Sequence, residues 1–139
     1  MKTNGKIAIW RYRQALSNYA GFHATADADG AAFIAGVIGS LSTGSEGRIT
    51  LVSITPRILS VPNNPRDQAV GYGTFVVRAR EGRNLQTFFD AHPVLTLAAS
   101  PDSLAALAAG FREVATGAGD FTIGPDEHNL WFWWWPNRG

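Results

Sequence analysis

SPDSLAALAAGFREVATG, residues 100–117, gives this chain its clearest structural pattern. Ser100 suits the N-cap of a helix, Pro101 its first position and Asp102 its first turn. Gly117 then ends the pattern as a C-terminal cap. Between these ends, apolar residues recur at helical spacing and predict one buried stripe: Leu104, Leu107, Ala108, Phe111 and Val114.

The same pattern occurs 73 residues earlier in the chain. Asp27 takes the N-cap position, and Thr43-Gly44 ends the pattern as Thr116-Gly117 ends the later one. The agreement of cap, stripe and ending without a gap indicates an internal duplication, although alanine-rich helices also match one another by chance. The stripe residues that coincide with Leu104, Leu107, Phe111 and Val114 are Ala31, Ile34, Ile38 and Leu41.

Strand-like segments flank both predicted helices. They cover residues 6–13, 20–25 and 48–54 in the first half, and 74–80, 94–98 and 129–135 in the second. Residues 55–73 contain three prolines and an Asn-Asn pair and read as a long loop, in which residues 57–61 form a short edge strand.

These elements predict an α+β two-layer sandwich. We expect a mostly antiparallel sheet of about six or seven strands, with two helices on one face. The chain would be a single domain, residues 1–139, in which β-β-α-β halves at about 1–54 and 74–135 are joined by the loop 55–73.

Composition narrows the class of protein. The 139 residues are 45% hydrophobic and 17% charged, which is typical of a globular chain and not of a disordered one. The absence of cysteine excludes disulfides, a thiol nucleophile and cysteine-ligated metal. The longest apolar stretch, residues 31–41, is far shorter than the roughly 20 residues of a membrane span, so we expect a cytoplasmic protein without membrane contact.

The charges are unevenly distributed along the chain. Residues 48–83 hold six arginines and two acids, whereas residues 102–127 hold one arginine and five acids. This pattern fits solvated faces that partly pair with each other, or alternatively a basic patch for an acidic partner. Because the net charge is +1 and the arginines are not interleaved with aromatic residues, the sequence argues against a nucleic-acid partner.

Residues 130–136, LWFWWWP, hold four of the five tryptophans. In a strand, Trp131, Trp133 and Trp135 would face one side, and Phe132 and Trp134 the other. Neither side is then an ordinary solvent face. The face of Trp131, Trp133 and Trp135 is predicted to form an aromatic core, to contact a second copy of the chain, or to be a platform for sugar rings or bases.

Residues 30–45 carry no charge, although a surface helix normally has a polar face opposite its core stripe. Within this face, Ala32, Gly36 and Ser40 recur every four residues and would allow another backbone to approach closely. The helix is therefore predicted to be covered by a loop or to contact a second copy. The small residues expected opposite the stripe are Ala32, Ala35, Gly36, Gly39 and Ser40.

The candidate catalytic residues are three histidines and two acids. A small enzyme would combine them in an acid–base or metal site, and would need a cleft that holds at least two of them. No spacing places two metal ligands on one element, and no glycine-rich loop precedes a helix, so neither metal nor cofactor is predicted. These candidates are His23, Asp27, Asp90, His92 and His128.

The sequence thus favours a non-catalytic protein-interaction module, a homodimer that binds another macromolecule in an accessory, inhibitor or immunity-type role. Arginine from a neighbouring strand would stack on the tryptophan rings. One alternative is the small His/Asp enzyme, and another is carbohydrate or nucleobase binding on a tryptophan platform. The expected binding residues are Trp131, Trp133, Trp135, Arg78 and Arg80.

Overall fold

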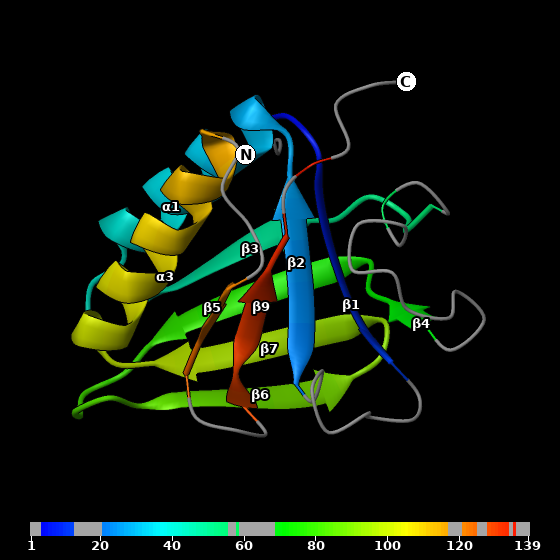
Figure 1. The fold of residues 1–139 in the computed structure, drawn as a ribbon. Helices are drawn as coiled ribbons and strands as arrows, with labels where there is room; N and C mark the ends of the chain where they lie inside the picture. The colour runs from blue at the N-terminus through cyan, green and yellow to red at the C-terminus, as the bar shows by residue number, and fades with distance from the viewer. Residues whose placement is uncertain are drawn as a thin grey trace.

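Among the residues that it describes, the computed structural model has two β-sheets and two long helices (Figure 1). It describes residues 4–12, 21–55, 58, 69–116, 121–124, 128–133 and 135. The predicted α+β class, the layer of two helices and the mostly antiparallel pairing are confirmed. The elements, in order, are β1 (Ile7–Tyr12), β2 (Phe22–Ala26), α1 (Ala28–Ser40), β3 (Glu46–Thr50), β4 (Ala69–Gly71), β5 (Thr74–Ala79), β6 (Gln86–Ala91), β7 (Val94–Ala99), α3 (Pro101–Ala115), β8 (Phe121–Ile123) and β9 (Leu130–Phe132).

The strands are divided between two sheets instead of forming one. Sheet A has the order β4-β1-β2-β9-β8, and sheet B has the order β3-β5-β7-β6. The sheets meet at the residues that directly follow β3, close to the residue that precedes β5. There Leu51 N donates to Gly73 O, whereas Val52 N donates to Ile7 O of β1 (both 2.9 Å). One short segment therefore bonds to both sheets, which fixes how they meet.

If β4 is left out, two successive sets of elements have the same topology. In β1-β2-α1-β3-β5 and in β6-β7-α3-β8-β9, an antiparallel pair is followed by a helix and a second antiparallel pair. Each second pair joins the sheet of the other set, through the parallel contacts β5–β7 and β2–β9. Strand β5 therefore corresponds to β9, whereas the sequence suggested that residues 74–80 open the second half. The duplication itself stays a prediction.

The two helices lie side by side on the same side of both sheets (Figure 1). The Asp27 carboxylate caps α1 by accepting hydrogen bonds from Gly30 N (2.8 Å) and from Lys6 N (2.9 Å), just before β1. Helix α1 ends at Ser40, four residues before the predicted stop at Gly44, whose φ of +91° serves the turn into β3. Gly117 and Trp134 lie outside the described residues, as do all residues of the predicted strand 57–61 except Ile58, which is helical and not extended.

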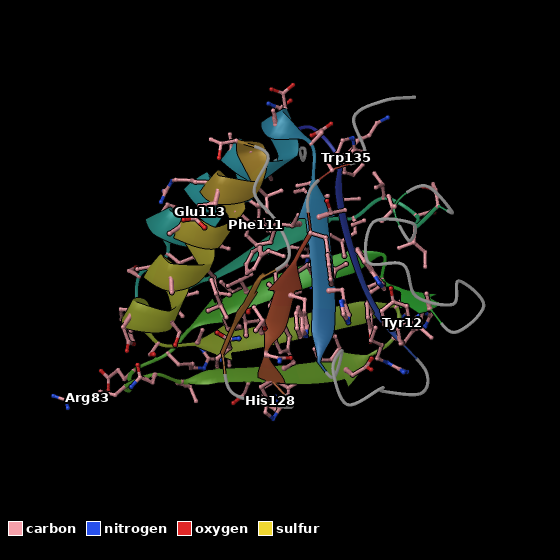
Figure 2. The ribbon with its side chains drawn as sticks, viewed as in Figure 1. Tyr12, Arg83, Phe111, Glu113, His128 and Trp135 are labelled. Atoms are coloured by element: carbon pink, nitrogen blue, oxygen red, sulfur yellow. The ribbon has the colours of Figure 1, made fainter. Side chains whose placement is uncertain are left out.

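The main core lies between the inner faces of the sheets and the helices. The α3 stripe is fully confirmed, and Phe111 points from α3 toward the sheets, where its ring meets Phe132 edge-on at 4.9 Å (Figure 2). In α1, Ala35 is buried, so its predicted place on the outer face was wrong, while Leu41 is only half-buried. Neither described helix is long and apolar enough to cross a membrane.

Candidate functional site

The outer face of sheet A carries a second hydrophobic cluster, which we call the outer aromatic cluster. Strand alternation turns Trp10 and Tyr12 of β1 toward it, on the side of β1 away from the helices, where Figure 2 also places Trp135. Trp133 is only 3% exposed, whereas Trp131 and Trp135 are half-buried. Its buried members are Ala8, Trp10, Tyr12, Ile58 and Trp133, and its half-buried members are Val52, Ile54, Ala69, Trp131 and Trp135.

His23 lies fully buried inside this cluster. Trp133 Nε1 donates to His23 Nδ1 at 2.9 Å, so in the neutral ring the proton is on Nε2. The rings of Trp10 and Trp131 lie nearly parallel to the imidazole, at centroid distances of 5.7 and 6.1 Å. His23 therefore holds an aromatic core together, and the Asp27 carboxylate, four residues later, is engaged at the start of α1.

A cluster of three polar side chains joins the two sheets. Arg11 Nε donates to Asp90 Oδ2 (2.8 Å) and to Tyr72 OH (3.0 Å), and Tyr72 OH donates to the same Asp90 oxygen (2.7 Å). Burial, together with the hydrogen bond to Asp90, raises the pKa of Tyr72 well above its ordinary value. The phenol therefore stays protonated and the carboxylate is already paired, which suits a structural bridge better than an acid–base pair.

His92 lies beside this bridge. Its Nε2 is 2.9 Å from Gly71 O, and its ring is tilted against that of Tyr72 at 5.5 Å. A shallow pocket of about 310 Å³ adjoins them. Asp90 and His92 are thus the two predicted catalytic residues that the fold brings to a common neighbour, Tyr72.

The third histidine covers an edge of sheet B. His128 Nδ1 accepts a hydrogen bond from Phe88 N of β6 at 3.0 Å, and Figure 2 places the side chain beside that strand. His23, His92 and His128 thus have different hydrogen-bond partners. Within the part of the chain that the structure describes, no group of three or more potential ligands could hold a metal ion.

The predicted binding residues are divided between the two sheets. Arg78 Nε pairs with Glu46 Oε1 at 3.1 Å across β5 and β3, and Arg80 bonds to the Ala79 carbonyl. The neighbours of β9 are β2 and β8. Neither arginine therefore lies on a strand next to the tryptophans.

Sequence reasoning missed the outer face of sheet B. Residues that alternate with the core residues of its strands turn away from sheet A and from the helices. Phe89 of β6 is 55% exposed. Among the described residues, it is the one large hydrophobic residue that is exposed. Across the sheet, the three rows of this face are Thr50-Thr74-Val94-Ala91, Arg48-Val76-Thr96-Phe89 and Glu46-Arg78-Ala98-Thr87.

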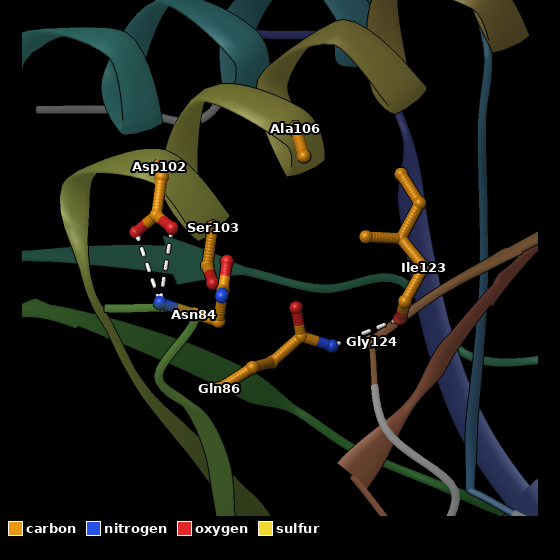
Figure 3. Close-up of a pocket in the computed structure, with 7 residues that line it drawn as sticks. All are labelled: Asn84, Gln86, Asp102, Ser103, Ala106, Ile123 and Gly124. Carbon is orange, nitrogen blue, oxygen red and sulfur yellow. Dashed lines mark hydrogen bonds between the residues drawn. The ribbon is translucent and has the colours of Figure 1, made fainter. Parts of the chain in front are cut away.

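A pocket opens where α3 begins, next to the start of β6 and the end of β8 (Figure 3). On its rim, the Asp102 carboxylate accepts hydrogen bonds from Asn84 N (2.9 Å) and from the Ser100 hydroxyl. These hydrogen bonds lower the pKa of Asp102, and the bond from Ser100 has the largest effect. Ser100 in turn accepts from Leu85 N, so the segment before β6 is tied to the start of α3.

The contribution of the Asp102 carboxylate to the stability of the fold should depend on pH. The pKa of Asp102 is lower in the folded than in the unfolded chain. The ionised carboxylate therefore stabilises the fold at pH values above the unfolded pKa of about 3.9, and this stabilisation is lost as the pH falls through the folded pKa. Asp102→Asn should therefore lower the melting temperature at pH 6, with a difference from wild type that shrinks toward pH 2.5. Circular dichroism melts would measure it, with Glu113→Gln near the other end of α3 as the control. A difference that stays constant with pH would contradict this role.

Comparison with known protein families, with curated proteins and with solved structures finds no match to this chain.

Proposed function

We propose that this chain is a non-catalytic interaction module that binds another macromolecule, in an accessory, inhibitor or immunity-type role, through the outer face of sheet B. The observation that carries the proposal is Phe89, a large aromatic side chain that is 55% exposed at the end of the central row of this face. Aromatic residues on an open, weakly charged surface are typical anchors of protein interfaces.

The chemistry around Phe89 supports a protein partner. Thr74, Thr87 and Thr96 offer hydroxyl groups across the face, and Val76 and Ala98 form an apolar floor at its centre. The charged groups gather at the β3 side, where Arg78 and Glu46 already pair with each other. An apolar anchor with polar and charged groups around it resembles the centre and rim of an interface.

The covered edge of β6 indicates that a partner binds the outer face of sheet B and does not add a strand to its edge. Phe88 N is occupied by His128 Nδ1, and the Gln86 side chain donates to the His128 carbonyl (2.7 Å). A covered strand edge offers little backbone to an incoming strand. Phe89, one residue further along, turns its side chain onto the open face.

The homodimer part of the proposal is supported by helix α1. Ala32, Gly36, Gly39 and Ser40 are exposed, and a Cβ atom built at Gly36 would meet no described atom within 4 Å. Small residues on an uncharged helix face are suited to a close contact with the same face of a second copy.

Replacing Phe89 with serine should weaken partner binding at least tenfold while changing the melting temperature little, because most of the side chain is already in water. A photo-crosslinking amino acid placed at position 89 would identify the partner in extracts of the source cells. The same amino acid at position 105, an exposed position of α3, serves as the control. Calorimetric titration of that partner then compares wild type with Phe89→Ser and Ala105→Ser.

Equal crosslinking from positions 89 and 105, or an affinity unchanged by Phe89→Ser, would overturn the assignment of this face. Sedimentation velocity of the unmodified protein tests the oligomeric state in the same series. A dimer is expected, and a monomer at every concentration would contradict the dimeric part of the proposal.

A further inference from the structure

We propose that the pocket at the start of α3 is a separate binding site for a guanidinium group. We call it the Gln86 pocket. It has a volume of about 340 Å³, within the range of small-ligand sites. It is lined by Asn84, Gln86, Asp102, Ser103, Ala106, Ile123 and Gly124 (Figure 3).

The first observation is the buried carboxamide of Gln86, which is 4% exposed. Its Nε2 donates to Ile123 O (2.9 Å) and to His128 O (2.7 Å). The reverse orientation would set Oε1 against two carbonyl oxygens, so these bonds fix the amide with its oxygen outward. Figure 3 shows that oxygen pointing into the pocket, where no described residue donates to it. An acceptor that is held in place at the wall of a pocket can receive an N–H or O–H donor from a ligand.

The second observation is the charge of the rim. Among the described residues, no lysine or arginine forms an ion pair with Asp102. The Asp102 carboxylate also accepts from backbone N–H groups at the helix start, which would otherwise attract an anion. The pocket therefore presents two acceptors, one of them negatively charged, so it should repel carboxylates and phosphates and attract a cationic donor.

The shape of the pocket favours a planar cation. Ala106 and Ile123 provide apolar walls, and the Ser103 hydroxyl lies between Asp102 and Gln86. A guanidinium group carries donors on its edges, has no acceptor and is weakly hydrated on its faces. It can therefore donate to Gln86 Oε1 and to Asp102 while its flat face rests on the apolar wall. A free guanidine compound and the arginine side chain of a partner share this chemistry.

Nuclear magnetic resonance of the ¹⁵N-labelled full chain tests the site directly. Titration with methylguanidinium should give saturable shifts of the Gln86 side-chain amide and of the Asn84 backbone amide. N-methylurea, a neutral molecule of similar shape with a carbonyl acceptor in place of one donor group, should bind at least tenfold more weakly. Shifts that are spread over the whole protein, that do not saturate, or that are equal for the two probes would overturn the proposal.

Matched variants on α3 separate the pocket from the helix that borders it. Ala106→Gln should fill the pocket and weaken methylguanidinium binding at least tenfold, whereas Ala105→Gln, at a neighbouring exposed position, should leave it unchanged. Equal effects of these two variants would also overturn the site. Both positions are exposed, so neither variant is expected to unfold the protein.

A second titration identifies the source of the guanidinium group. If N-acetyl-arginine N-methylamide binds at least as tightly as methylguanidinium, the pocket accepts an arginine side chain of a protein; if only methylguanidinium binds, it accepts a free compound. Either result supports the site. The Phe89→Ser variant should bind methylguanidinium normally, which keeps this test independent of the proposed function.

Discussion

Replacing Trp133 with alanine should lower the free energy of unfolding by about 3–5 kcal/mol, the usual cost of removing a large buried aromatic side chain. Trp133 is 3% exposed and packs in the outer aromatic cluster. Its ring lies nearly parallel to that of Trp131 at 5.8 Å, and its Nε1 donates to His23 Nδ1. The substitution would therefore leave a cavity on sheet A and take the indole donor away from a fully buried histidine.

Urea unfolding monitored by circular dichroism measures this effect. Trp133→Phe serves as a partial control, since it keeps most of the packing but removes the indole N–H, and it should cost about 1–3 kcal/mol. Trp131→Ala, at a half-buried ring, should cost less than Trp133→Ala. A loss below about 1 kcal/mol for Trp133→Ala would mean that the ring is a surface anchor, and would favour the alternative of a tryptophan platform for sugar rings or bases.

The helices could be predicted because their signals are local. Caps, stripes and a proline at the first position lie within one stretch of chain, and both helices form where the sequence placed them. The end of α1 was placed too late because a glycine after the last apolar residue reads as a cap even when it serves the following turn. Alternation within the tryptophan strand also placed Phe132 and Trp133 on opposite faces, in the main core and in the outer aromatic cluster.

Strand β6 was not predicted because apolar and polar residues do not alternate along it. Gln86 is buried and bonded to backbone carbonyls, whereas Phe89 is exposed. The expected alternation of apolar and polar residues is therefore absent, and with it the signal for the strand that carries both proposed sites. Strand β8, with three residues, is too short to leave such a pattern.

The partners of the candidate residues could not be predicted because they come from distant segments. The His23–Trp133 hydrogen bond joins residues 110 positions apart, through the parallel contact of β2 with β9. Arg78 and Arg80 were assigned to the tryptophans on the assumption of one sheet. The two sets of elements instead exchange their second strand pairs, which places β5 in sheet B and β9 in sheet A.

The same substitution, glycine to alanine, should have opposite effects in the two helices. A Cβ atom at Gly110 of α3 would lie 2.8 Å from Phe132 Cζ and 3.0 Å from Ile123 Cδ1. The Phe132 ring cannot easily retreat, because Phe111 packs edge-on against it. Gly110→Ala should therefore lower the free energy of unfolding by about 1–3 kcal/mol despite the better helix propensity of alanine.

Gly36→Ala in α1 should instead raise the free energy of unfolding by about 0.5–1 kcal/mol, because the position is exposed and its new methyl group meets no described atom. Denaturant unfolding of both variants at low protein concentration measures the pair, and a change of the same sign in both would contradict this packing. If a second copy packs on the Gly36 face, the methyl group also weakens the dimer. The gain seen at low concentration should then shrink or reverse as the protein concentration rises, because association stabilises the wild type more than the variant.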